Sequence, residues 1–252
     1  MKSKKLRFPG STGVDLAGRI DLPDESEPTA FALFAHCFTC SKDFKAVVNI
    51  SKALTARGLG VFRFDFTGLG ESEGDFADTT FSSNIDDLLA AITYMADEFE
   101  TPRILIGHSL GGAAVIQAAL KTEECRAVGI IAAPYDPSHV KHLLSEKADE
   151  IERKGEATVT IAGRSFTIKK QFLDDLENEA LKTELGNLRR PLIVFHSPID
   201  NVVGIDNAAK IFMAAKHPKS FISLDQADHI LSNERDSKYT GAIIAEWASK
   251  YV

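Results

Sequence analysis

The sequence predicts an α/β fold in which a mostly parallel sheet of about eight strands is covered by helices on both faces. Short runs such as Ala30–Ala35 are apolar at every position, as expected for central strands that are buried on both sides. These runs alternate with segments of helical periodicity, and the links between them are short. The 252 residues also suffice for one large domain with a substantial core.

The elements follow one another in a regular order along the chain. Residues 4–8 and 15–22 are expected to form an opening antiparallel pair around a Gly-Ser-Thr-Gly turn. The further strands are expected at 30–35, 61–65, 103–106, 127–133, 192–196 and 220–224. The helices are expected at 44–57 with Gly58 as its C-terminal cap, from Ser82 or Ser83 to about Glu98, at 113–120, at 207–216, and at the C-terminus with Ile243, Ile244, Trp247 and Ala248 on its inner face.

The alternation lapses between residues 134 and 190, and an unstructured loop of that length is unusual in a compact domain. A charged helix is expected over 139–153, a hairpin over 158–168 that turns near Ala162-Gly163, and one or two short helices over 171–188. Because this excursion is too short for an independent domain, we expect a single domain over 1–252 with an insertion at about 135–190 that caps the sheet edge.

Composition excludes several classes of partner. The net charge of −7 and the pI near 5.5 argue against nucleic-acid binding, which draws on clustered Lys and Arg. The basic start is followed by Pro9-Gly10 rather than by an apolar segment, and no apolar run approaches the ~20 residues that span a bilayer. Three cysteines fit a reducing compartment better than a disulfide framework. We therefore expect a cytoplasmic protein that has no nucleic-acid or membrane partner.

Ser109 lies on a predicted strand-to-helix turn, in the sequence Gly107-His108-Ser109-Leu110-Gly111. A side chain on so sharp a turn projects clear of the sheet edge, and the two flanking glycines avoid collisions with the neighbouring strand and helix. The turn also directs the first helical N–H groups toward whatever the serine attacks. This pattern is typical of a nucleophile elbow, although small residues also make tight turns without any catalytic role.

A serine nucleophile needs a general base, and the base needs an acid that orients it. Catalytic side chains in a parallel sheet gather beyond the C-terminal ends of the strands. Asp200 follows the strand that ends at His196, and His229 follows the last strand. The order Ser109, Asp200, His229 is the order associated with such an elbow.

The other acids and histidines fit a structural role better. Asp206 is expected on the surface of a helix, and Asp228 adjoins His229, so that their side chains should diverge. His196 is expected near the site as a neighbour, and His108 as a packing residue whose ring points away from Ser109. The remaining candidates, His139, His142 and His217, are expected to be exposed.

An oxyanion hole requires two donors. Leu110 N–H is one candidate, and Phe38 N–H, in the loop after the third strand, is the other. The ring of Phe38 and the side chains of Tyr135, Phe166 and Phe172 are expected to line the substrate pocket. The glycine-rich loop 67–74 has the spacing G-x-G-x-x-x-G with no helix opening on it, so we do not interpret it as a dinucleotide site.

Cys37 and Cys40 form a C-x-x-C pattern, for which redox chemistry and metal binding are alternatives. Zinc would need further ligands, and only His36 is nearby, so we expect neither a metal nor a cofactor. We interpret the pair as two small inert thiols. A reversible disulfide that distorts the Phe38 donor is the alternative hypothesis.

With these residues in place, the chain resembles the α/β-hydrolase superfamily over nearly its whole length. The sequences 107–112 and 65–74, with Asp200 and His229, carry the resemblance. The sequences 36–42 and 196–200 are similar, more narrowly, to the hydrolase portion of proteins fused to an OsmC-like domain, and we expect that second domain to be absent from this chain. Many relatives carry glycine at the position of Cys37, which leaves the backbone of the oxyanion loop open.

The resemblance implies a cofactor-independent serine esterase that acts on small carboxylic esters through an acyl-enzyme. The expected partners are a small-molecule ester and, among proteins, a second copy of the chain in a homodimer. Two other classes stay open. One is a non-catalytic binding module of the same fold, and the other is a thiol redox protein that uses Cys37 and Cys40.

Overall fold

The computed structural model describes residues 1–161, 163–178 and 185–252. Its main sheet has eight strands in the order β1-β2-β4-β3-β5-β6-β9-β10. The first two strands run antiparallel to their neighbours, and all the others are parallel. The strands are β1 Lys2–Pro9, β2 Asp15–Leu22, β3 Ala30–Ala35, β4 Leu59–Phe64, β5 Ile104–His108, β6 Ala127–Ile131, β9 Leu192–His196 and β10 Lys219–Ser223. The predicted fold class is confirmed.

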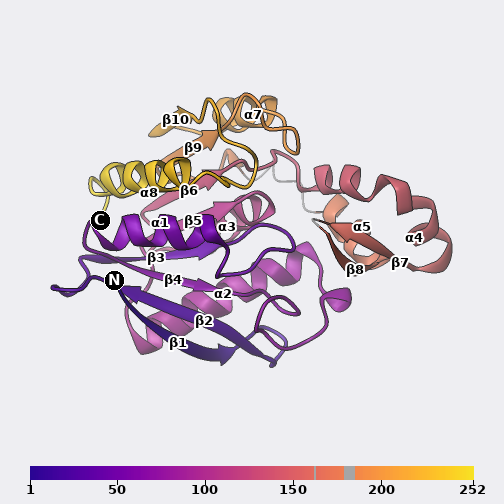
Figure 1. The fold of residues 1–252 in the computed structure, drawn as a ribbon, viewed down its shortest axis with the longest axis horizontal. Coiled ribbons are helices and arrows are strands. Elements are labelled where there is room, and N and C mark those ends of the chain that lie inside the picture. The colour runs from indigo at the N-terminus through magenta and orange to yellow at the C-terminus, as the bar shows by residue number, and fades with distance from the viewer. Residues whose placement is uncertain (162, 179–184) are drawn as a thin grey trace.

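Helices cover both faces of this sheet. On one face α1 (Lys45–Thr55) lies beside α8 (Glu234–Ala248), as Figure 1 shows. On the other face lie α2 (Phe81–Glu98), α3 (Leu110–Leu120) and α7 (Asp206–Ala214). Successive residues of a strand serve opposite faces. In β3, for example, Leu33 packs in the core of α2 and α3, whereas Phe34 packs in the core of α1 and α8.

Two predicted helix caps are wrong by a few residues. The N-cap of α2 is Thr80 rather than Ser82 or Ser83, because Thr80 has an extended backbone and forms a reciprocal capping box with Ser83. The C-cap of α1 is Ala56 rather than Gly58. Gly58 lies two residues further on, with a φ of 86°, in the turn that leads to β4.

The chain between β6 and β9 builds a separate unit, which Figure 1 shows at the end of the molecule away from both termini. Its described elements are the 3₁₀ segment η2 Pro137–Lys147, α4 Ala148–Lys154, the two-stranded sheet of β7 Glu156–Ile161 and β8 Arg164–Lys169, and α5 Lys170–Asn178. The predicted hairpin is present, although its position 162 lies outside the described residues. One or two short helices were predicted over 171–188. The described one, α5, extends to residue 178, and residues 179–184 lie outside the described residues.

The helix predicted over 139–153 is wrong in type for most of its length. The segment is 3₁₀ up to Lys147 and α-helical only from Ala148. Local side-chain bonds favour the tighter turns: Asp136 accepts from the Ser138 N–H, and the Ser145 hydroxyl donates to the carbonyl of His142 three residues earlier.

Candidate active site

Ser109 lies in the turn between β5 and α3, with φ 54° and ψ −126°. This is a left-handed backbone conformation that non-glycine residues rarely adopt. The surrounding structure holds it in place, since the Ser109 N–H donates to the Ile131 carbonyl at 2.8 Å and the Ser109 carbonyl accepts from Gly112 N–H. The predicted strand-turn-helix around Ser109 is therefore present.

The two flanking glycines are required by close backbone approach. A Cβ on Gly107 would lie 2.2 Å from the Gly111 oxygen, and a Cβ on Gly111 would lie 2.4 Å from the His36 oxygen. Neither neighbour is a flexible side chain that could move aside. The steric reason expected from the sequence is confirmed at both positions.

The structure brings Ser109, His229 and Asp200 together. His229 Nε2 lies 3.0 Å from Ser109 Oγ, and His229 Nδ1 lies 2.8 Å from Asp200 Oδ2. A carboxylate only accepts, so the imidazole proton is on Nδ1 and the lone pair of Nε2 faces the serine hydroxyl. All three residues are less than 10% exposed. The arrangement allows the hydroxyl proton to move to Nε2.

Asp200 is held as a carboxylate. Its Oδ1 accepts from the N–H groups of Val202 and Val203, both at 2.9 Å. Burial favours the neutral acid, but the hydrogen bond and charge of His229 and these two backbone donors outweigh it, so the pKa of Asp200 is lowered. A charged Asp200 fixes the tautomer of His229 and would stabilise an imidazolium.

Two further buried histidines hold the loops that carry these residues. His108 Nε2 donates to the carbonyl of His229 at 2.7 Å, and His196 Nε2 donates to the carbonyl of Val203 at 2.7 Å. Burial lowers the pKa of both rings, that of His108 to about 3, so both are neutral. The sequence analysis expected His196 as a neighbour of the site and His108 as a packing residue. It missed these bonds, because each ring reaches a loop that only the fold brings close.

Within the described residues, the backbone N–H groups of Phe38 and Leu110 donate to no protein group. The loop that carries Phe38 is closed by a Cys37–Cys40 disulfide with a Cα–Cα distance of 5.4 Å. The expectation of two free thiols is therefore wrong. A turn in which the Cys40 N–H donates to the Cys37 carbonyl at 3.0 Å brings the two residues within bonding range, and Thr39 between them has a φ of 65°.

A buried ion-pair network anchors the end of this loop, and sequence reasoning assigned it no role. Lys42 is 1% exposed, and its Nζ lies 2.7 Å from Asp65 Oδ2 and 2.7 Å from Glu71 Oε2. Burial opposes the charge on Lys42, but the two carboxylates outweigh it and raise its pKa. Hydrogen bonds from Lys42 and Lys5 lower the pKa of Glu71 to about 2.

Three of the aromatic side chains predicted to line the substrate pocket lie in one cluster, which includes Phe76. The ring of Phe38 lies 5.3 Å from that of Phe172 and 5.5 Å from that of Phe76, and Phe166 lies 5.1 Å from Phe76. Phe172 is buried and Phe166 half-buried. Tyr135 is half-buried, no ring contact joins it to this cluster among the described residues, and its N–H donates to the Asn207 side chain. The insertion therefore contacts the loop of Phe38 directly.

The other acids and histidines considered in the sequence analysis lie as expected, with one exception. Asp206 pairs with Lys210, and Asp228 accepts hydrogen bonds from Ser232 rather than from His229. His142 and His217 are exposed. His139 is half-buried, because its Nε2 donates to the Val202 carbonyl at 2.9 Å, so the expectation of an exposed ring is wrong there.

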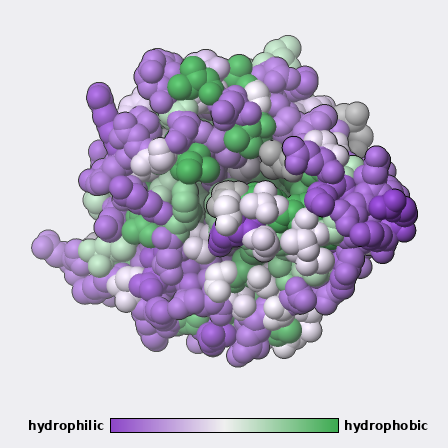
Figure 2. All heavy atoms as spheres, turned by 45° about the vertical axis from the view of Figure 1, so that its right-hand side comes forward, coloured by the Kyte–Doolittle hydropathy of each residue, from purple (hydrophilic) through white to green (hydrophobic). Residues whose placement is uncertain are grey.

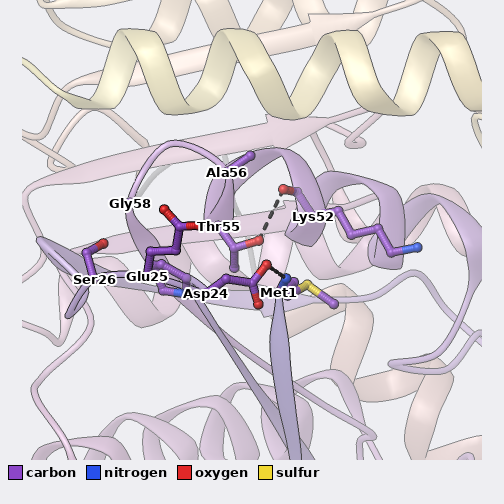
Figure 3. Close-up of a pocket in the computed structure, with 9 residues that line it drawn as sticks. Met1, Asp24, Glu25, Ser26, Lys52, Thr55, Ala56 and Gly58 are labelled. Carbon is purple, nitrogen blue, oxygen red and sulfur yellow. Dashed lines mark hydrogen bonds and ion pairs between the residues drawn. The ribbon is translucent and has the colours of Figure 1, made fainter.

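A hollow of about 570 Å³ lies near the amino-terminal ends of β3 and β4, whereas Ser109 lies at the carboxyl end of β5. Its lining residues include Met1, Asp24 and Lys52 (Figure 3). The N-terminal ammonium pairs with Asp24 there, and the hollow holds no nucleophile with a base. The face in Figure 2 is mostly hydrophilic, with apolar residues in scattered patches. Among the residues that the structure describes, no helix has the length and apolar character to cross a bilayer.

The fold and the Ser109, His229 and Asp200 cluster define the class of protein, an α/β hydrolase of the serine-hydrolase type. The family model described as serine aminopeptidase, S33 (Hydrolase_4) matches residues 27–154. The chain belongs to this family.

Known relatives agree with that assignment. The crystal structure of the esterase domain of a Rhodothermus marinus protein is 49% identical, with a TM-score of 0.82, over 100% of this chain and 99% of that one. Mouse palmitoyl-protein thioesterase ABHD10, mitochondrial, is 29% identical over 198 residues, which are 76% of this chain and 65% of that protein, so the chain spans just under two thirds of it. A structure of mouse α/β hydrolase domain-containing protein 10 has a TM-score of 0.81 at 24% identity, over 98% of this chain and 99% of that one.

Proposed function

We propose that this protein is a carboxylesterase that cleaves small carboxylic esters through an acyl-enzyme on Ser109. The observation that carries the proposal is the continuous hydrogen-bonded line from Ser109 Oγ through the His229 ring to Asp200, at 3.0 and 2.8 Å. This spacing suits proton transfer from the serine to the imidazole.

The proposed reaction proceeds in two halves. Ser109 Oγ attacks the ester carbonyl while its proton moves to His229 Nε2, and Asp200 stabilises the imidazolium that forms. His229 then returns this proton to the leaving alkoxide, and the alcohol departs. In the second half His229 takes a proton from the water that attacks the acyl-enzyme carbonyl. The bond to Ser109 Oγ then breaks, His229 returns the proton to Oγ, and the acid is released.

We assign the oxyanion hole to the N–H groups of Phe38 and Leu110. Each is without a protein acceptor among the described residues, and each borders the turn that carries Ser109. Such preorganised donors stabilise the negative charge that develops on the carbonyl oxygen. The insertion, through Phe166 and Phe172, would limit the size of the substrate.

The direct test is p-nitrophenyl acetate turnover by the wild type and by Ser109→Ala. We expect kcat to fall by a factor on the order of 10³ or more in the variant, because the nucleophile is lost while the fold is kept. Equal turnover in the two proteins would refute the proposal and would favour a non-catalytic binding module.

Cys37→Ser tests the thiol redox alternative. An esterase should keep measurable Ser109-dependent turnover in this variant, because the sulfur takes no part in acyl transfer. A thiol oxidoreductase would instead lose its activity in Cys37→Ser and keep it in Ser109→Ala. Dithiol oxidation and ester hydrolysis should therefore be assayed side by side on both variants.

Thioester hydrolysis is the second candidate, favoured by the 29% identity to mouse palmitoyl-protein thioesterase ABHD10. The same three residues would serve, since a thioester carbonyl is attacked in the same way. Comparing kcat/KM for acetyl and palmitoyl thioesters of one thiol with that for p-nitrophenyl acetate separates the two candidates.

A further inference from the structure

The disulfide between Cys37 and Cys40 encloses the residue whose N–H is assigned to the oxyanion hole. It joins Cα atoms 5.4 Å apart and leaves Phe38 and Thr39 between its two ends. The Phe38 N–H donates to no protein group among the described residues. The sulfur atoms take no part in acyl transfer, so the disulfide acts on catalysis through the position of this donor.

The direction of the Phe38 N–H is set by the peptide plane that it shares with the Cys37 carbonyl. That carbonyl accepts two hydrogen bonds, one from the Cys40 N–H at 3.0 Å and one from His36 Nδ1 at 2.8 Å. The disulfide links Cys40 to Cys37, the donor and the acceptor of the first bond. It therefore supports one of the two hydrogen bonds that hold the plane, and His36 supplies the other.

Thr39 has a backbone conformation that its residue type does not favour. Its φ is 65°, in the left-handed region, where a β-branched residue is an outlier. The chain is held on either side of this turn, because β3 ends at Ala35 and the Lys42 N–H donates to the buried Asp65 carboxylate at 2.6 Å. Breaking the S–S bond should therefore relax residues 37–40 and leave the domain folded.

The three cysteines differ in their access to solvent. Cys40 is half-buried, whereas Cys37 is 5% exposed. A thiolate from solution therefore reaches Cys40 more easily. Cys125 is free and fully buried, and burial raises the pKa of its thiol to about 11. Because a buried, protonated thiol is inert, a thiol reagent applied to the folded protein counts only Cys37 and Cys40.

We propose that Cys37 and Cys40 form a redox switch on the oxyanion hole, that a dithiol is its reductant, and that the oxidised protein is the more active form. The proposal rests on the proposed esterase function. When the S–S bond is reduced, the Cys40 N–H is no longer held against the Cys37 carbonyl. The peptide plane then tilts for part of the time, and the Phe38 N–H leaves the position in which it stabilises the oxyanion.

Reduction proceeds by thiol–disulfide exchange. One thiolate of the dithiol attacks Cys40 Sγ, the S–S bond breaks, and Cys37 leaves as a thiolate that takes up a proton. The second thiolate of the dithiol attacks its own sulfur in the mixed disulfide, and Cys40 leaves in the same way. The protein gains two electrons and two protons, and the dithiol becomes a disulfide, which can reverse these steps.

Dithiothreitol at a series of reduced-to-oxidised ratios tests the proposal on the wild type. After desalting, p-nitrophenyl acetate turnover gives kcat and KM, and a thiol reagent counts the free cysteines in the same sample. Ser109→Ala, treated in the same way, supplies the background rate. Near-UV circular dichroism of each sample shows whether the reduced protein keeps its tertiary packing.

We expect kcat to fall about threefold to tenfold as Cys37 and Cys40 become free, with a smaller change in KM, because the weakened interaction belongs to the transition state. The fall should be smaller than the roughly hundredfold loss that follows removal of a whole oxyanion donor, since the bond from His36 remains. Oxidised dithiothreitol should restore the original kcat.

The double variant Cys37→Ala/Cys40→Ala removes the switch. At every ratio it should have the lower kcat of the reduced wild type, and it should not respond to dithiothreitol. Cys125→Ala is the matched control, because it removes a cysteine that lies outside the loop. It should keep both the kcat of the oxidised wild type and the full response to reduction.

Several results would overturn the redox switch while leaving the esterase intact. One is an unchanged or higher kcat in wild-type protein whose Cys37 and Cys40 are counted as free. Another is a disulfide that excess dithiothreitol does not reduce in the folded protein. A fall in kcat that accompanies loss of the near-UV signal, or that oxidation does not reverse, would assign the bond to stability alone. Wild-type turnover no faster than that of Ser109→Ala at every ratio would instead refute the esterase function itself.

Discussion

His108 precedes the serine in sequence, yet its ring bonds to the loop of the catalytic base candidate. Its Nε2 donates to the His229 carbonyl, 121 residues away in the chain. Burial first, and then the nearby His229, lower its pKa from 6.5 to about 3. A protonated ring would carry its charge in a buried position without solvent. The folded state therefore favours a neutral His108.

This dependence predicts how stability changes with pH. The pKa of His108 is lower in the folded state, so between pH 6.5 and about 3 the unfolded chain binds the extra proton. The stabilisation is complete above pH 6.5 and is lost as pH falls, by up to about 1.4 kcal/mol per pH unit. Urea unfolding at pH 7 and 4.5 should show a smaller loss for His108→Gln than for the wild type. Equal losses of unfolding free energy in the two proteins would contradict a lowered pKa of His108 in the folded state.

The turn between β5 and α3 works because α3 begins against the backbone at the end of β3. Gly111 approaches the carbonyls of His36 and Ala35 so closely that a Cβ would lie 2.4 and 2.7 Å from their oxygens. One glycine therefore sets the spacing between the serine turn and the loop of Phe38, and with it the separation of the two oxyanion donors.

Gly111→Ala should consequently impair both stability and turnover. Backbone must move to admit the methyl group, so we expect a loss of about 1–3 kcal/mol in the free energy of unfolding and a fall in kcat of at least tenfold. Gly129→Ala, in β6, is the control, because its nearest neighbour would be at an ordinary 3.5 Å. Thermal unfolding and esterase assays of both variants check this, and unchanged kcat in Gly111→Ala would be the contrary result.

At the scale of the whole molecule, the ion-pair network around Lys42 connects the antiparallel edge of the sheet to the loop that carries Phe38. Lys42 contacts Asp65, just beyond β4, and Glu71 in the following loop, while Glu71 also pairs with Lys5 of β1. Asp65 is fully buried. Its charge is tolerable only because Lys42 neutralises it and backbone N–H groups of Lys42 and Glu71 donate to it.

Lys42→Met keeps the length of the side chain but leaves the Asp65 charge buried without its counter-ion. We expect a loss of about 3–5 kcal/mol in the free energy of unfolding. Lys5→Met removes an exposed partner of Glu71 and should leave the unfolding midpoint nearly unchanged. Chemical denaturation of both variants at pH 7 measures the difference, and equal midpoints would refute a structural role for the buried pair.

The local pattern of the chain determined the main elements of the fold. Apolar runs fixed β3, β5 and β9 to within two residues, because a strand buried on both faces has no alternation to obscure it. Gly107, Ser109 and Gly111 specified the sharp turn, since only small residues fit there. The positions of Asp200 and His229 after parallel strands were enough to predict that they meet Ser109.

Only the tertiary structure decided which distant groups become partners. The Cys37–Cys40 bond, the Lys42–Asp65 pair and the bonds of His108 and His196 to the two loops depend on how backbone segments approach one another. Loss of solvent and the charges of neighbouring groups then determine whether each buried ring or carboxyl group is charged. Residue type and spacing carry no record of that environment. The approach of Asp200 and His229 to Ser109 could therefore be predicted from the sequence, whereas the groups that hold their loops in place could not.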